Sequence, residues 1–222
     1  SLLKILSPSM GFESGYLRKL PLIESDSLDS IVERVKHCID GSNAEWDSFE
    51  ISWDFKKHPL LRNISTISEA FAQWQAECDD RFNKLKANEE ELNHIFIDIY
   101  GLQDELTPEV EDKDVTVRKA DLQRDIKSLL SYAVGCMFGR YSLDVEGLAY
   151  AGGEWDSSKY QSYIPDEDNV IPITDEEYLD DDIVSRLCAW LKVVYGADTL
   201  EANLDYIAKA LGNKGSTSRE II

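Results

Sequence analysis

The stretch Ser131–Asp144, SYAVGCMFGRYSLD, is the most informative for the fold. Its apolar residues and spaced glycines predict a packed helix, and it contains few groups that could catalyse a reaction. Its glycines, Gly135 and Gly139, are four residues apart and so would share one helix face. Glycine in a helix costs about 1 kcal/mol relative to alanine, so two in register need a compensating gain, usually close approach of another backbone. We therefore predict a tightly packed core helix with Gly135 and Gly139 as helix-packing positions. The alternative is a ligand pocket here.

Helical patterns also precede this stretch. Apolar residues at steps of three and four predict a first helix that starts near Ser25 or Asp26 and stops at Gly41. The same spacing from about Ser65 to Tyr100 predicts either one long helix or two, broken near residues 87–88. The positions that define the first helix are Leu28, Ile31, Val32, Val35 and Ile39.

The glycine-bearing helix is predicted from about Lys119 to Tyr141, and roughly thirty irregular residues follow it. Within them Val170–Ile173 has the composition of a short strand, which could pair with Asp114–Val117. An irregular segment of this length usually packs on a partner surface or covers something.

Two further helices are predicted near the end of the chain. Thr174 and Glu177 have the spacing of a capping box for a helix ending at Gly196, and a last short helix is predicted over 198–211. The fold class is therefore mainly α: a helical bundle-like module with one long helix and a small irregular or β-containing insertion.

Composition limits the possible functions. The chain has 222 residues, 43% of them hydrophobic, enough for one full core or two small ones. Its net charge of -20 repels a phosphate backbone, which argues against broad non-specific DNA binding. No apolar run approaches the roughly 20 residues needed to cross a bilayer. The cysteines have neither disulfide nor zinc spacing and indicate reduced packing residues of a cytoplasmic protein; they are Cys38, Cys78, Cys136 and Cys188.

Both ends of the sequence suggest a fragment. The first residue is Ser1, and the apolar run after it has no helix-start signal. Thr217 and Glu220 form a T-x-x-E helix start, but the sequence stops at Ile222. We therefore expect the chain to be part of a longer protein.

Motifs that suggest chemistry have simpler explanations. Acidic residues over 175–182 occupy the first turns of the predicted helix, where the helix dipole favours them. Residues 166–169 lack the glycine and distal glutamate of a calcium loop, and GNKGS at 212–216 lacks the glycine spacing of a phosphate loop. We predict no catalytic, cofactor-binding or metal-binding residue in this chain.

The stretch Trp46–Arg62 is the most plausible contact surface. Trp53 and Phe55 could anchor a neighbouring domain while Lys56, Lys57 and Arg62 meet phosphates. The alternative places the aromatic rings in the core and leaves the lysines in water.

Several segments together resemble a known family, the PglX-type adenine-specific DNA methyltransferases of type 1 bacteriophage exclusion (BREX) systems. The likeness covers nearly the whole chain and matches the C-terminal half of these proteins. The segments that carry it are SWDFKKHPLL (52–61), IFIDIYGLQDELTPEV (95–110), SYAVGCMFGRYSLD (131–144), LAYAGG (148–153), NVIPITDEEY (169–178) and ALGNKGSTSREII (210–222).

The resemblance implies methyl transfer from S-adenosylmethionine to adenine in a specific DNA site, as self-marking in phage defence. This chain contains no Pro-Pro step and no counterpart of the family's Asn-Pro-Pro-Tyr catalytic loop or cofactor-binding glycine loop, so the cofactor is implied for the parent protein alone. The resemblance divides the chain into the tail of a target-recognition domain (1–23) and a helical spacer and docking module (24–222).

The implied partners are the other domains of the same polypeptide, DNA through the parent protein, and other phage-defence proteins. No membrane partner is expected. Candidate DNA contacts are Arg18, Lys19, Lys56 and Lys57. The rival hypothesis is an autonomous acidic protein-binding module or DNA mimic, which only the net charge of -20 supports.

Overall fold

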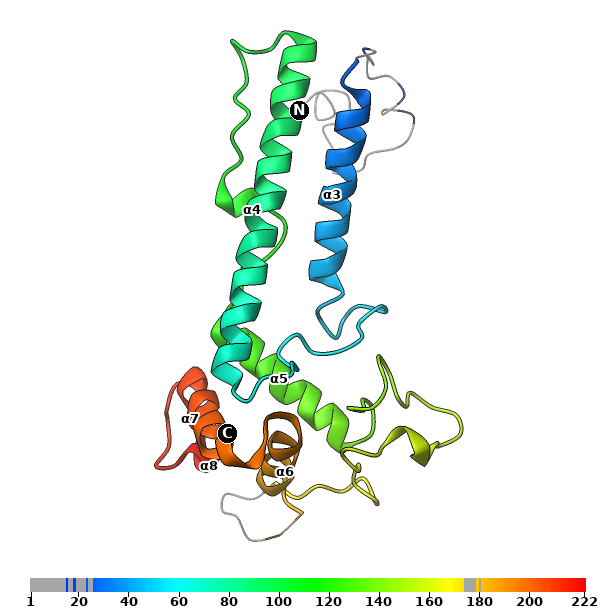
Figure 1. Ribbon diagram of the computed structural model, residues 1–222, viewed down its shortest axis with the longest axis vertical. Helices are drawn as coiled ribbons and strands as arrows, with labels where there is room; N and C mark the ends of the chain where they lie inside the picture. Colours follow the sequence, from blue (N-terminus) through cyan, green and yellow to red (C-terminus); the bar gives the residue numbers. More distant parts are fainter. Residues whose placement is uncertain (1–14, 16–17, 19–22, 24–25, 174–178, 180) are drawn as a thin grey trace.

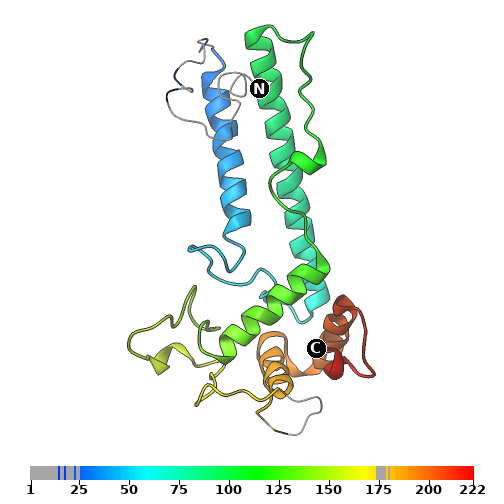
Figure 2. The ribbon, with the colours of Figure 1, turned by 180° about the vertical axis from the view of Figure 1, so that it is seen from behind.

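Two antiparallel helices form a long arm that stands on a smaller helical base (Figure 1). Helix α3 spans Leu28–Trp46 and helix α4 spans Ile67–Tyr100, and the two lie side by side in both views (Figures 1 and 2). The structure is a computed structural model and describes residues 15, 18, 23, 26–173, 179 and 181–222. The base contains α5 (Leu122–Met137), α6 (Ile183–Tyr195), α7 (Leu200–Leu211) and α8 (Ser218–Ile221). Short 3-10 turns are η1 (Asp112–Asp114), η2 (Ser157–Lys159) and η3 (Ala197–Thr199).

The prediction of a mainly α fold is confirmed, and the predicted strand pair is wrong. Within the described residues no segment forms a β-strand. Val115 and Val117 are buried, but they pack against Phe82 and Leu85 as the chain returns along α4. The insertion after α5 is therefore irregular, and its residues Val170–Ile173 have no strand partner.

Helix α4 is one continuous helix of 34 residues. The side chain of Thr66 accepts a hydrogen bond from the backbone N–H of Glu69 at its start, and Gly101 ends it in the left-handed conformation, with φ of 65°. At a rise of 1.5 Å per residue, α4 is about 50 Å long. The length of α4 therefore sets the length of the arm.

Helix α3 runs beyond its predicted end at Gly41. It continues through Gly41 to Trp46, and a Cβ at Gly41 would lie 3.8 Å from Cγ of Arg81 on α4, in ordinary contact. Its apolar stripe is exposed: Leu28 is 62% and Ile39 is 53% exposed. Arg34 instead faces α4, donating to Oδ1 of Asn88 at 3.3 Å. The arm is therefore joined partly by polar contacts.

One hydrophobic core holds the base and the lower end of α4 together. Every helix from α4 to α7 contributes side chains to it, among them Ile67, Trp74, Ile126, Leu129, Trp190, Leu191, Leu204 and Ile207. Two buried polar residues join its helices. Asp125 of α5 accepts from Nε1 of Trp74 at 3.1 Å, and Asn203 of α7 accepts from the backbone N–H of Ile67 at 2.8 Å. These bonds fix where the arm leaves the base.

The two glycines of the fold-deciding stretch have different environments, so the prediction of a shared helix face is wrong. Helix α5 ends at Met137, and Gly139 follows it with φ of 73°. Gly135 stays helical, but a Cβ there would lie 2.6 Å from Cδ2 of Tyr141, a ring and not another backbone. A Cβ at Gly139 would lie 2.7 Å from the indole of Trp155. Each glycine thus makes room for an aromatic ring.

The last helices largely follow the predictions. Helix α6 begins at Ile183 with Asp182 as its N-cap, later than predicted, and it ends at Gly196 as predicted. The predicted cap at Thr174 and Glu177 lies outside the described residues. Helix α7 and the Thr217–Glu220 capping box of α8 are confirmed. Cys78, Cys136 and Cys188 are buried, as expected of packing residues, and Cys38 is half-buried.

Candidate docking surface

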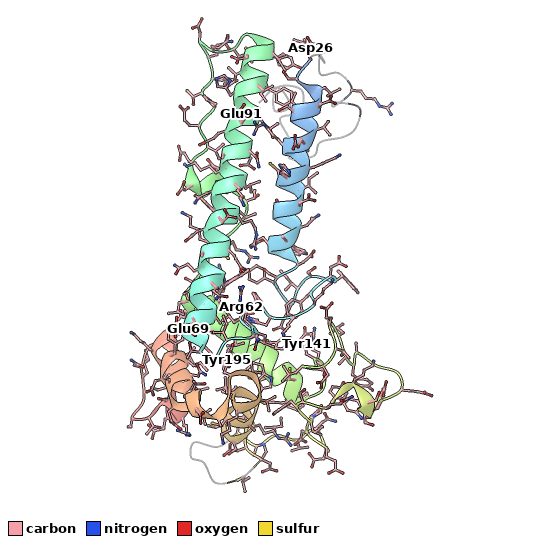
Figure 3. All side chains as sticks on the ribbon, viewed as in Figure 1. Asp26, Arg62, Glu69, Glu91, Tyr141 and Tyr195 are labelled. Carbon is pink, nitrogen blue, oxygen red and sulfur yellow. The ribbon has the colours of Figure 1, made fainter. Side chains whose placement is uncertain are left out.

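The Trp46–Arg62 stretch divides its aromatic residues between the core and the solvent. Phe55 is 5% exposed and packs edge-on against Tyr132 and Tyr141, with ring centroids 6.0 and 5.6 Å apart. Trp53, two residues earlier, is fully exposed, at 101%. The loop between α3 and α4 is thus anchored by one ring and presents the other. Figure 3 shows Tyr141 near the base of the arm.

The candidate DNA contacts are not all equivalent. Lys56 and Lys57 are exposed, and Nζ of Lys56 lies 3.8 Å from a carboxylate oxygen of Glu146. Arg62 is engaged within the chain, because both of its terminal nitrogens donate to Glu77, at 2.5 and 2.7 Å. Arg18 is exposed, and Lys19 lies outside the described residues. The fold therefore presents Lys56 and Lys57 in the same loop as the exposed Trp53.

Three adjoining hollows connect the Trp53 loop with the irregular insertion after α5. The first, of about 430 Å³, is lined by Trp53, Ile51, Arg140 and Leu148 among others. The second hollow is also lined by Arg140 and Leu148, so it adjoins the first. Phe138 and Tyr150 line both the second hollow and a third one, which is described below. We call this continuous region the docking surface. Its exposed apolar side chains are Ile51 (64%), Trp53 (101%), Phe138 (38%), Leu148 (53%), Trp155 (50%) and Ile164 (64%).

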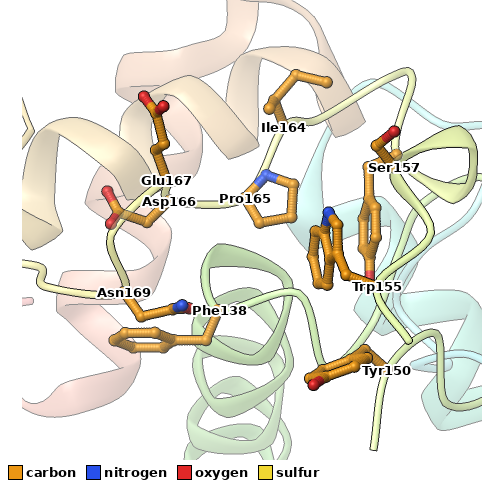
Figure 4. Close-up of a pocket in the computed structure, with 10 residues that line it drawn as sticks. Phe138, Tyr150, Trp155, Ser157, Ile164, Pro165, Asp166, Glu167 and Asn169 are labelled. Carbon is orange, nitrogen blue, oxygen red and sulfur yellow. The ribbon is translucent and has the colours of Figure 1, made fainter. Parts of the chain in front are cut away.

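The third hollow, which we call the Trp155 bowl, has a volume of about 530 Å³. Figure 4 shows Trp155 on one side of the bowl and Asp166, Glu167 and Asn169 on the opposite side. It is lined by Phe138, Tyr150, Trp155, Ser157, Tyr160, Ile164, Pro165, Asp166, Glu167 and Asn169. The bowl is therefore largely aromatic on one side and polar or acidic on the other.

Hydrogen bonds tie the bowl to the end of α5. The hydroxyl of Tyr160 donates to the carbonyl of Gly139 at 2.5 Å, and the rings of Tyr160 and Trp155 stack with centroids 4.6 Å apart. The N–H of Asp166 donates to the carbonyl of Met137 at 2.8 Å, and its carboxylate pairs with Arg186 of α6. The positive φ of Gly139 thus allows the insertion to fold back over the helix end.

Polar groups at the floor of the first hollow are partly desolvated. Burial raises the pKa of the Glu50 carboxyl above its usual value. Its Oε2 accepts from the hydroxyl of Tyr141 at 3.4 Å, and a hydrogen bond from Ser131 and the charge of Arg140 partly offset the effect of burial. Glu50 therefore contributes a partly buried carboxylate to the lining of this hollow.

Sequence reasoning identified the Trp53 loop but missed the Trp155 bowl. The signal for the bowl was the length of the irregular insertion, which predicted a segment that packs on a partner surface or covers something, without showing which residues line a hollow. Across the described ranges, no three His, Cys, Asp or Glu residues group as metal ligands would. No described helix has both the length and the apolarity needed to span a bilayer.

Comparison with known proteins identifies two relatives. The chain is 52% identical over its full length to an adenine-specific methyltransferase PglX of Lacticaseibacillus casei (strain Zhang). It is 30% identical, over 93% of its length, to an adenine-specific methyltransferase BrxX of Escherichia coli O9:H4 (strain HS). It spans 19% of the length of each, and no protein-family model matches it. Along its whole length, the chain is therefore similar to one region of the PglX-type adenine-specific methyltransferases, as its sequence motifs implied.

Proposed function

We propose that the chain is a non-catalytic spacer and docking region of an adenine-specific DNA methyltransferase in phage defence, and that it positions recognition and catalytic domains on DNA. The observation that carries this proposal is the pair of exposed apolar faces, on the arm and beside the base. One is the α3 stripe with Leu28 and Ile39, and the other is the docking surface around Trp53. Contiguous exposed apolar surface usually marks an interaction site.

The arm has the length that a spacer needs. At about 50 Å, α4 is as long as roughly 15 base pairs of duplex DNA. A methyltransferase that reads a specific DNA site and flips an adenine out of it must contact the recognised bases and the flipped adenine on one duplex at the same time. A helix joined to the base through Asp125 and Asn203 would hold such domains at a fixed separation.

Docking can be tested by oxidative footprinting of Trp53 in the 222-residue chain and in the complete methyltransferase that contains it. We expect Trp53 to oxidise readily in the chain and to be protected in the complete protein, because another domain covers it there. Trp190, which is 0% exposed in the core of the base, is the internal reference for a tryptophan that stays protected in both proteins. Equal oxidation of Trp53 in both proteins would refute docking at this surface.

DNA contact needs a separate test, because it depends on Lys56 and Lys57. Changing both to Glu in the complete enzyme should weaken DNA binding similarly for all sequences and reduce the salt slope by about 2, leaving the preferred site unchanged. The exposed residues Lys36 and Lys209, both changed to Glu, provide a control with the same change in charge. If affinity and slope stayed at the control values, these lysines would not contact DNA.

A further inference from the structure

We propose that the Trp155 bowl receives an arginine or lysine side chain from a basic polypeptide segment. This inference rests on the proposed docking role and names the chemistry of the partner. The first reason is the open aromatic surface. One face of Trp155 stacks on Tyr160, yet the residue is 50% exposed, and Tyr150 meets it edge-on at 5.3 Å. Cations bind preferentially over such ring faces.

The second reason is the charge around the bowl. The segment 138–169 carries seven carboxylates (Asp144, Glu146, Glu154, Asp156, Asp166, Glu167 and Asp168) and two basic side chains (Arg140 and Lys159). Arg186 compensates Asp166, and Nζ of Lys56 lies 3.8 Å from a carboxylate oxygen of Glu146. Glu167 is exposed, and no basic side chain of the described residues pairs with it. This charge attracts a cation and repels the phosphates of a nucleic acid.

The third reason is that the bowl is built before a ligand arrives. Oδ1 of Asp166 accepts from the N–H groups of Asp168 and Val170, both at 3.2 Å, and this fixes the acidic rim. Tyr160 is fixed to Gly139. A preformed site loses less conformational entropy on binding. The volume of about 530 Å³ accepts a long side chain with its aliphatic stem along Phe138.

The test uses the indole Nε1–H signals of the five tryptophans in the 222-residue chain, with Trp155 assigned through Trp155→Phe. The probe is a blocked Gly-Ser-Arg-Ser-Gly peptide, and the matched probe has citrulline, the uncharged isostere, in place of arginine. We expect the arginine peptide to shift the Trp155 signal saturably and to bind about fivefold more tightly than the citrulline peptide, the difference expected for one cation–π contact. Equal binding of both peptides would overturn the proposal.

Variants locate the contacts. Glu167→Gln should weaken binding of the arginine peptide about two- to threefold, as for an exposed ion pair, whereas the exposed Glu105→Gln should leave it unchanged. Trp155→Ala should abolish saturable binding of the arginine peptide measured by calorimetry, and Trp46→Ala should not. Saturable binding of adenosine at Trp155, or no shift up to about 10 mM arginine peptide, would also overturn the proposal.

The outcomes distinguish this inference from the docking role itself. If the arginine peptide does not bind at Trp155 while Trp53 is protected from oxidation in the complete protein, the assignment of an arginine or lysine ligand is wrong and the docking role is retained. If the peptide binds while Trp53 oxidises equally in both proteins, the bowl recognises a cation but the proposed docking is wrong.

Discussion

Substituting alanine for two helical glycines should change stability in opposite directions. Gly41 in α3 and Gly135 in α5 both lie inside helices, so alanine gains up to about 1 kcal/mol of helix propensity at each. A Cβ at Gly41 meets only Cγ of Arg81, at 3.8 Å, so the gain should be retained. A Cβ at Gly135 meets the Tyr141 ring at 2.6 Å, closer than real Cβ contacts allow.

The Tyr141 ring has little room to move away. It is 1% exposed, stacks on Tyr132 with centroids 4.8 Å apart, and meets Phe55 at 5.6 Å. Overpacking of this kind costs about 1 to 3 kcal/mol, which exceeds the propensity gain. We expect Gly135→Ala to destabilise the chain by about 1 kcal/mol net and to lower Tm by roughly 2 to 4 °C.

Urea unfolding followed by circular dichroism measures these changes, and a double-mutant cycle isolates the ring. In a Tyr141→Ala background the clash is absent, so Gly135→Ala should become stabilising by up to about 1 kcal/mol. The reasoning would be refuted if Gly135→Ala stabilised the chain with Tyr141 present, as Gly41→Ala should. It would also be refuted if the loss were the same without Tyr141.

Three further predictions concern a buried amide, a buried imidazole and the cofactor. Asn203→Ala should lower the free energy of unfolding in urea by about 1 to 3 kcal/mol, because the buried N–H of Ile67 loses its acceptor, whereas the exposed Asn83→Ala should change it little. Equal losses in the two variants would refute the importance of this buried hydrogen bond. Burial lowers the pKa of His58 to about 3, below the value near 6.5 expected in the unfolded state. Between these two pH values the unfolded state binds one more proton than the folded state. The free energy of unfolding should therefore fall as pH drops from about 6.5 toward 3. His58→Gln should flatten that part of the stability profile, and exposed His37→Gln should not; parallel profiles would contradict the assignment. Calorimetry should detect no binding of S-adenosylmethionine to the chain alone, and one-site saturation would place the cofactor site within it.

The sequence alone predicted the features that depend on local interactions. Helix α4 follows its apolar spacing to Gly101, α6 ends at Gly196, and the Thr217–Glu220 capping box forms as predicted. These features depend on side chains a few residues apart, whose geometry is fixed once the backbone is helical. The mainly α class followed from the same spacing.

Only the tertiary structure decided which faces are covered. The apolar spacing of α3 predicted an amphipathic helix, but it could not show whether the apolar face is covered, because periodicity identifies a face without identifying its partner; Leu28 and Ile39 are exposed. The spacing of Gly135 and Gly139 predicted one helix face, but α5 ends between them, and the rings that need the space belong to Tyr141 and Trp155. The sequence therefore determined the main helices, the ends of α4 at Gly101 and of α6 at Gly196, the Thr217–Glu220 capping box and the chain's charge. The end of α5, the Trp155 bowl and the exposure of Trp53 depend on contacts between distant residues, which no local pattern encodes.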